Sequence, residues 1–259
     1  MRAAAAAIRN LAEGPDWPLL AVAGLAWAIL LAAEQIPGAP PICAAAGVDP
    51  VAMAHFWLFS MAGWGGPVAV FAALIAMPVA MTAPLLQTPL GHVRRSALYE
   101  RRARAVVLFL TGHLSVWAVT AAALMGLGFG LGSLVSFPIA ATGVAIAAGL
   151  VWQGTPYKLI ARNRTHVRLP LPACGAQADA AALRYGARSA AFCAASCWPL
   201  MLAPMTTGRA HLAMMAAAAA LMLCERTARP IGAVLRWRWI GAGLAVGTCV
   251  VTGLLVSTP

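Results

Sequence analysis

Residues 105–125 read AVVLFLTGHLSVWAVTAAALM, a run of 21 residues without a charged side chain. An α-helix rises about 1.5 Å per residue, so a run of this length spans the roughly 30 Å hydrocarbon core of a bilayer. Arg101, Arg102 and Arg104 come directly before it. Each would cost about 2.5–3.5 kcal/mol at the centre of a membrane helix, so the apolar segment begins after them. The run predicts a transmembrane helix.

Six other apolar runs accompany this one. The seven predicted spans are 17–36, 67–87, 105–125, 133–153, 189–205, 210–224 and 239–256. The composition agrees, because 62% of the 259 residues are hydrophobic and 10% are charged, against roughly half and a quarter in soluble domains. This excludes a soluble enzyme, a disordered chain and a collagen-like chain. We predict an all-α fold, a polytopic transmembrane helix bundle in which residues 1–259 form a single integral membrane domain.

Two connections carry further local expectations. Runs 189–205 and 210–224 are short for a span and are joined closely through Gly208. They therefore form either a tight helical hairpin or a re-entrant pair. The Ala-rich piece 177–188 predicts a separate surface helix on the inner side.

Glycine clusters mark a turn and two candidate crossing points. The glycine-rich stretch 126–132 predicts a flexible outer turn between the third and fourth runs. Gly128 with Gly132, and Gly243 with Gly247, have the GxxxG spacing that lets membrane helices approach closely.

The basic residues support the span count, because all but Arg209 fall on one side of it. They precede the first span or join the second to the third, the fourth to the fifth and the sixth to the seventh: Arg2, Arg9, Arg94, Arg95, Arg101, Arg102, Arg104, Lys158, Arg162, Arg164, Arg168, Arg184, Arg188, Arg226, Arg229, Arg236 and Arg238. The positive-inside rule makes that side cytoplasmic. We therefore expect the N-terminus inside and the C-terminus outside.

Two of the six cysteines are distinguished by their spacing. Cys193 and Cys197 are four residues apart, so they share one helix face with Cβ atoms about 5–6 Å apart. A cysteine in a packed core is often only a small hydrophobe, and that interpretation stays open. Two sulfurs suffice for linear Cu(I), or for trigonal Cu(I) with a methionine, whereas structural Zn²⁺ needs two further ligands. The pair predicts a soft-metal site with copper as the favoured metal.

Three ionisable residues of the spans and their ends are further candidates. His113 lies near the middle of the third run, where an ionisable group is a functional candidate by default. A neutral histidine bonded to a neighbouring helix is the simpler interpretation. Glu225 ends the sixth run at the depth of Lys158, which predicts an ion pair at the inner face.

Methionines gather near the outer end of the fifth and sixth runs. Met201 and Met205 end the fifth run, and His211, Met214 and Met215 open the sixth. Such a group could form an entry site for a soft metal. Methionine is also the usual filler of gaps in packed cores, and this alternative stays open.

No catalytic or cofactor-binding residue set is predicted, and we do not expect an enzyme. The chain has no HExxH, P-loop or GxSxG motif. The net charge of +11 lies in the short connections, so it indicates a lipid bilayer as partner and no nucleic acid.

Several motifs together carry a family resemblance. They are Gly91-His92-Val93-Arg94-Arg95-Ser96, Thr155-Pro156-Tyr157-Lys158, the Cys193 to Trp198 stretch and Leu223-Cys224-Glu225-Arg226. Over roughly residues 65–230 this pattern resembles a bacterial family of predicted metal-binding integral membrane proteins of unestablished function. The resemblance implies a multi-pass protein of the bacterial inner membrane that binds a metal.

The chain departs from that family pattern at two positions. The family places two cysteines shortly after the lysine of the Pro-x-Lys motif, where this chain has Ala161 and Thr165. The resemblance therefore implies Cys193 and Cys197 as the thiol ligands, with His166 as a third ligand.

Three functions are consistent with these patterns. The leading hypothesis is an integral membrane protein that binds or delivers a soft metal ion, with copper favoured. The first alternative is a non-catalytic transmembrane subunit of a larger complex, which adds other membrane subunits as partners. The second is a small-molecule or ion transporter in which His113 couples transport.

Overall fold

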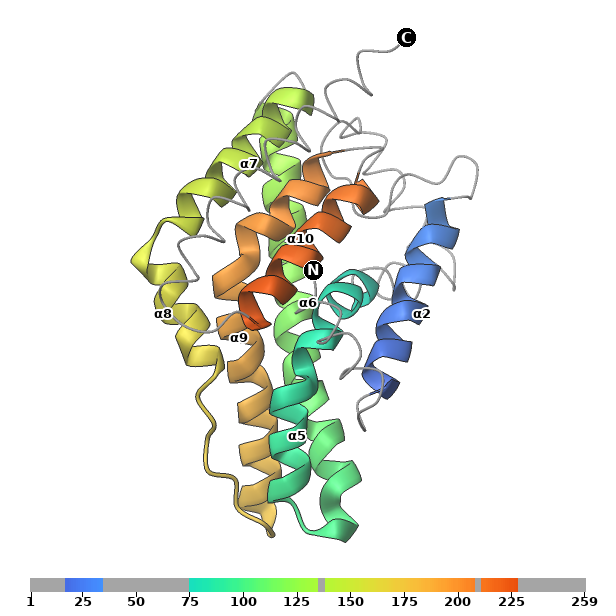
Figure 1. Cartoon of the computed structure of the whole chain (residues 1–259), viewed down its shortest axis with the longest axis vertical. Helices are drawn as coiled ribbons and strands as arrows, with labels where there is room; N and C mark the ends of the chain where they lie inside the picture. The colour runs from blue at the N-terminus through green and yellow to red at the C-terminus, as the bar shows by residue number, and fades with distance from the viewer. Residues whose placement is uncertain (1–16, 35–74, 135–137, 208–210, 228–259) are drawn as a thin grey trace.

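The structure is a computed structural model that describes residues 17–34, 75–134, 138–207 and 211–227 (Figure 1). Within these ranges every regular element is helical, which confirms the predicted all-α class. The predicted span 239–256 and the first part of 67–87 lie outside the described residues.

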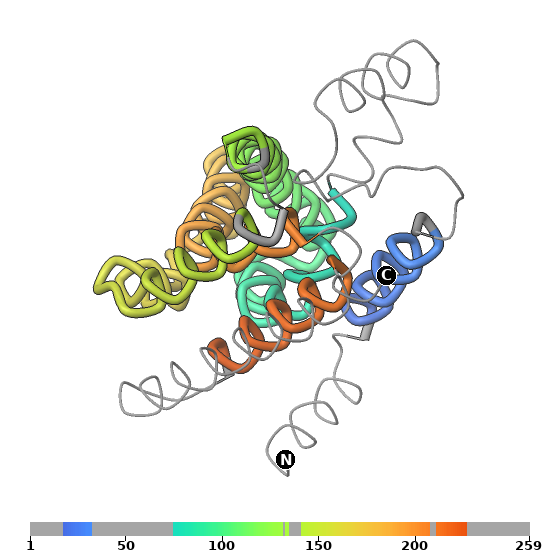
Figure 2. Tube along the Cα trace, turned by 90° about the horizontal axis from the view of Figure 1, so that it is seen from above, coloured from blue at the N-terminus to red at the C-terminus, as the bar shows by residue number. Residues whose placement is uncertain are grey.

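The described helices pack as a bundle around two long ones. In chain order they are α2 (Trp17–Glu34), the 3₁₀ helix η1 (Ala83–Leu86), α5 (Gln87–Ser96), the 3₁₀ helix η2 (Tyr99–Arg101), α6 (Arg102–Leu134), α7 (Pro138–Gln153), α8 (Pro156–Thr165), α9 (Ala176–Thr206) and α10 (His211–Thr227). Helices α6 and α9 share the most extensive contact and form the centre. Figures 1 and 2 show α8 and α2 at opposite edges of the bundle.

Two local expectations are wrong. Residues 126–132 form no turn, because α6 continues as helix to Leu134. A glycine costs only about 1 kcal/mol in a helix, which is too little to end a long packed one. Likewise 177–188 is no separate surface helix, because it continues without a break into 189–205 as the single helix α9. The fifth run is therefore the C-terminal part of a 31-residue helix.

Two of the described helices are long and apolar enough to cross a membrane. They are Tyr99–Leu131 and Ala176–Thr206. The helices Pro18–Ala32 and Ala141–Gln153 are also apolar but shorter. The third and fifth predicted spans fall inside the two long helices. Two is fewer than seven, so the full span count stays a prediction.

The two central helices cross with their backbones in contact at Gly112 of α6 and Gly186 of α9. A Cβ atom added to Gly112 would overlap the backbone carbonyl of Leu183, and one added to Gly186 would overlap that of Phe109. The GxxxG pairs do not predict this crossing, and Gly243 with Gly247 lies outside the described residues. Only glycine leaves room for such an approach.

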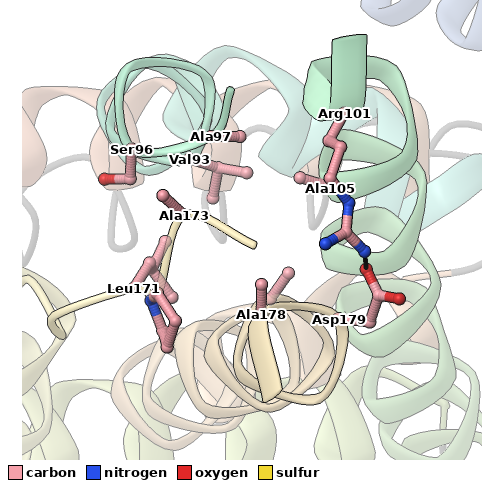
Figure 3. A pocket seen from close by; sticks show the side chains of 11 residues that line it. Val93, Ser96, Ala97, Arg101, Ala105, Leu171, Ala173, Ala178 and Asp179 are labelled. Carbon is pink, nitrogen blue, oxygen red and sulfur yellow. Dashed lines mark hydrogen bonds and ion pairs between the residues drawn. The ribbon is translucent and has the colours of Figure 1, made fainter. Parts of the chain in front are cut away.

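Salt bridges hold the basic ends of α6 and α9 together. Asp179, in the first turn of α9, accepts from Arg101 and from Arg104, each at 2.8 Å. Gly175, with φ of 83°, precedes α9 and accepts from Arg101 at 3.2 Å. Figure 3 shows the cavity of about 20 Å³ beside this cluster, lined largely by alanine and aliphatic side chains such as Val93. Those side chains offer no set of metal donors.

The crossing yields a testable prediction about stability. Gly112→Ala should lower the free energy of unfolding by about 1–3 kcal/mol, because its methyl group must push two backbones apart. Thermal unfolding of the purified protein in detergent, followed by circular dichroism, measures the effect. Gly126→Ala on the same helix is the matched control, because nothing lies within 4 Å of its added Cβ. Equal losses of unfolding free energy in the two variants would contradict the close crossing at Gly112.

Candidate metal centre

A small cavity lies where η1, α8, α9 and α10 meet. Its volume is about 20 Å³, which is room for about one water molecule or one metal ion. The lining residues come from all four elements: Leu85, Arg162, Thr165, Cys193, Ser196, Cys197, Met222, Glu225 and Arg226.

The two cysteines predicted from their spacing line this cavity side by side. Cys193 and Cys197 are buried on α9, with 4% and 3% of their surface exposed. The Cys197 thiol donates to the carbonyl oxygen of Cys193 at 2.9 Å, and the two thiol groups also interact with each other. The helical spacing therefore places both cysteines on the lining of the same cavity.

Met222 of α10 adds a third sulfur that the sequence analysis did not single out. It is 3% exposed and lines the same cavity as the two cysteines. Its position one turn before Glu225, the residue expected at the inner face, is the signal that indicates its depth. Thiolate and thioether sulfurs are the soft donors that select Cu(I).

Arg162 and Thr165 of α8 and Arg226 of α10 also line the cavity. Arg226 interacts with the Cys193 thiol and donates a hydrogen bond to the Thr165 hydroxyl. A positive charge beside a thiolate stabilises it, and the thiolate is the form that binds metal. Thr165 is one of the two positions where the resembling family has cysteine, so this position does face the cavity. Ala161, the other, is buried one turn earlier on α8.

His166 is not brought to the cysteine pair. It is exposed at the end of α8 and is absent from the cavity lining. Within the described residues no group of three or more His, Cys, Asp or Glu side chains is arranged to hold a metal. Partial desolvation, followed by the charges of Arg226 and Arg162, lowers the pKa of His166.

The other histidine candidates lie elsewhere in the bundle. His113 is 1% exposed at the α6–α9 crossing, where its ring stacks on Phe109 with centroids 6.0 Å apart. His211 and Met214 are buried at the N-terminal end of α10, the end opposite to Met222. None of these three lines the cysteine cavity.

Lys158 and Glu225 form a buried ion pair beside the cavity, with Nζ and Oε1 2.6 Å apart. The motif that begins at Thr155 explains the position of the lysine. The Thr155 side chain accepts from the Lys158 backbone N–H at 3.3 Å, and Pro156 occupies the first turn, so α8 begins here. Lys158 also donates to the Gln153 side-chain oxygen.

Burial and pairing act in opposite directions on this lysine. Burial lowers the pKa of Lys158 below its ordinary value of 10.5, and the charge and hydrogen bond of Glu225 partly restore it. Glu225 and Arg162 line both the cysteine cavity and a second one of about 200 Å³ beyond it. These two charged residues therefore lie where the sulfur site borders the larger cavity.

The fold and the site together define a helical protein with three buried soft sulfur donors on one ion-sized cavity. Residues 71–251, more than two thirds of the chain, match the family described as PpoB2, copper chaperone. The chain therefore belongs to this copper chaperone family, and copper is the metal to which its function relates. No curated protein and no solved structure matches the chain.

The ion pair yields a prediction with a pH dependence. Glu225→Gln should lower the free energy of unfolding by about 3 kcal/mol near neutral pH, because it leaves the buried Lys158 charge without its counter-ion. Chemical denaturation in detergent at several pH values measures this effect.

The sign of the pH effect follows from the lowered pKa of Lys158. As pH falls below 10.5, the unfolded chain takes up the proton before the folded one, so the folded state loses relative stability. Removing Glu225 lowers the pKa of Lys158 in the folded state further. The pH range in which only the unfolded chain carries this proton therefore becomes wider. The deficit of the variant should therefore shrink as pH rises toward 10.5. Lys158→Met with Glu225→Leu is the control, and it should recover most of the stability. A deficit independent of pH would contradict the assignment.

Proposed function

We propose that this chain is a multi-pass membrane protein that binds Cu(I) between Cys193, Cys197 and Met222 and hands it on. The observation that carries the proposal is the convergence of three sulfur atoms from two helices on one ion-sized cavity. Membership of a copper chaperone family supports copper as the cargo.

The number of donors favours Cu(I) over other thiophilic ions. Two thiolates satisfy a linear Cu(I) ion, and a weak thioether makes the site trigonal. A structural Zn²⁺ ion takes four ligands in a tetrahedron. Ala161 and Thr165 stand at the positions that would have supplied two more thiols, so the residues that line this cavity do not offer four thiolates.

A site of this kind suits transfer rather than storage. Cu(I) with two strong ligands and one weak ligand leaves room for a thiol or thioether of an acceptor to attack. The protons of the two thiols leave when the metal binds, so metal uptake is coupled to proton release.

The arrangement of charges supports insertion in a membrane. Helices α6 and α9, at about 1.5 Å per residue, are longer than the roughly 30 Å core of a bilayer. Their N-terminal ends lie together with α5 at one end of the bundle (Figure 1). Arg101, Arg104 and Arg184 belong to that end, where they would reach the cytoplasm. This is the side on which the sequence places the basic connections.

Exposed apolar side chains fit the same proposal. Leu25 on α2, Val119 on α6 and Val151 on α7 are 63%, 72% and 71% exposed. Side chains of this kind are stable against lipid tails, or against other membrane subunits if the chain acts within a complex. His113 packs on Phe109 rather than lining a described cavity, so its contacts do not favour the transporter hypothesis.

Cu(I) binding should depend on the cysteine pair. The purified full chain should bind about one Cu(I) ion tightly, and Cys193→Ser with Cys197→Ser should abolish this binding while the helical content stays the same. Competition against a chromophoric Cu(I) chelator in detergent measures the affinity. Cys174→Ser is the matched control, because Cys174 is exposed in the connection before α9.

Met222→Leu tests the third donor in the same assay. We expect a weakening of at least about tenfold with the stoichiometry retained. Unchanged Cu(I) affinity in the double serine variant would overturn the proposed site and leave the cysteines as packing residues.

The membrane topology is a separate prediction. A reporter fused after Pro259 should be external, because the last predicted span carries the chain out, and one inserted near Gly175 should be cytoplasmic. Paired alkaline phosphatase and fluorescent protein fusions in cells measure the two sides. Both reporters on the same side would remove the seven-span count.

A further inference from the structure

Sulfur atoms continue beyond the cavity along one face of α9. Cys193, Cys197, Met201 and Met205 follow one another at intervals of four residues, which places them on one helix face. All four are buried, with at most 4% of their surface exposed. The row runs from the cavity to the end of α9 near its connection with α10.

A second row of donors lies on α10. Met222 lines the cavity, Met215 lies nearly two turns earlier, and Met214 and His211 lie at the start of the helix. These four are at most 5% exposed. The methionines of both rows belong to one hydrophobic cluster, and α9 and α10 are in contact. The two rows therefore meet inside the bundle.

A third helical segment, residues 75–82, adds two more thioethers to the same cluster. Met77 and Met81 are buried and four residues apart, and Leu85, one turn further, lines the cysteine cavity. Of the 23 buried residues in this cluster, seven are methionine and four are leucine. A core that needed only apolar volume would use leucine for most of these positions, because leucine has better-defined rotamers.

We propose that these methionines form a relay that carries Cu(I) between His211 and Met205, at the connection of α9 and α10, and the Cys193–Cys197–Met222 cavity. This inference rests on the proposed function, which assigns the cavity to Cu(I). It adds a route, with a further set of weak Cu(I)-binding positions in the interior of the bundle.

The chemistry of thioethers suits this role. A bare ion in an apolar core is very unfavourable, so Cu(I) must be coordinated at every point of its path. Thioethers are neutral, soft and weak ligands, so each position can hold Cu(I) without retaining it. Positions four residues apart lie about 6 Å apart along the helix. The methionine side chain has three rotatable bonds, so neighbouring side chains can share the ion during transfer.

The exchange is balanced in atoms and charge. At each step one bond from copper to a donor atom forms while another breaks. The donor atom is a ring nitrogen at His211 and sulfur at the other positions. Copper remains Cu(I), so no oxidant or reductant is needed. Protons leave only at the last step, when the thiols of Cys193 and Cys197 become thiolates and release them to water.

The first test measures metal binding by the methionines directly. The full chain, labelled with ¹³C at the methionine methyl groups and carrying Cys193→Ser with Cys197→Ser, is titrated in detergent with Ag(I), a redox-stable probe for Cu(I). The methyl resonances of Met201, Met205 and Met215 should shift, each assigned from its own methionine-to-leucine variant. Met125 on α6 is the internal control, because it packs against the same cluster outside the two rows, and its resonance should not move. If the methyl resonances of Met201, Met205 and Met215 do not shift at saturating Ag(I), the relay is overturned.

The second test measures passage. The full chain with intact cysteines is placed in liposomes, and Cu(I) is supplied on the side of the α9–α10 connection. Met201→Leu with Met215→Leu nearly conserves volume, so we expect the fold and the equilibrium affinity of the cysteine cavity to be retained. The rate at which that cavity fills should fall about tenfold. Met125→Leu is the matched control, with an expected rate equal to that of the wild type.

The outcomes separate the two proposals. In one outcome Cu(I) binding needs the cysteines, but the variant Met201→Leu with Met215→Leu fills the cavity at the wild-type rate. This outcome overturns the relay and leaves the proposed function standing. Cu(I) binding that does not need the cysteines overturns the proposed function, while shifted methionine resonances would still support binding along the rows.

Discussion

The contact between the backbones of α6 and α9 at Gly112 and Gly186 sets the position of nearly everything else in the bundle. Because neither residue has a side chain, the axes approach until backbone meets backbone. Phe109 and His113 then stack beside the crossing, and Asp179 reaches Arg101 and Arg104 near the basic end. With α9 held in this way, its row of sulfur-bearing side chains faces α10 and the cavity.

Sulfur and charge lie side by side where α8, α9 and α10 meet. Cys193, Cys197 and Met222 supply soft donors, whereas Arg226 and the Lys158–Glu225 pair supply the local charges. A buried pair of this kind adds little net stability, although breaking it is costly. Glu225 lines both the sulfur cavity and the larger cavity, and Lys158 lines the larger one.

The candidate site was predictable where local spacing determines geometry. Cys193 and Cys197 share a face because residues four apart always do so in a helix, and the pairing of Glu225 with Lys158 followed from their common depth. Met222 was missed because its importance depends on how α10 packs against α9. His166 was expected from a resemblance, but the structure leaves it exposed at the end of α8 and outside the cavity lining.

The sequence by itself determined that this protein is all-α, that its apolar runs are long, and that its basic residues concentrate in a few connections, since composition and periodicity express local chemistry directly. Only the tertiary structure decided that α9 continues unbroken through 177–188, that Gly112 and Gly186 form the crossing, and that Met222 joins the cysteines. Those features depend on the free energy of packing one helix against another. That energy couples residues far apart in the chain, and no local pattern contains it.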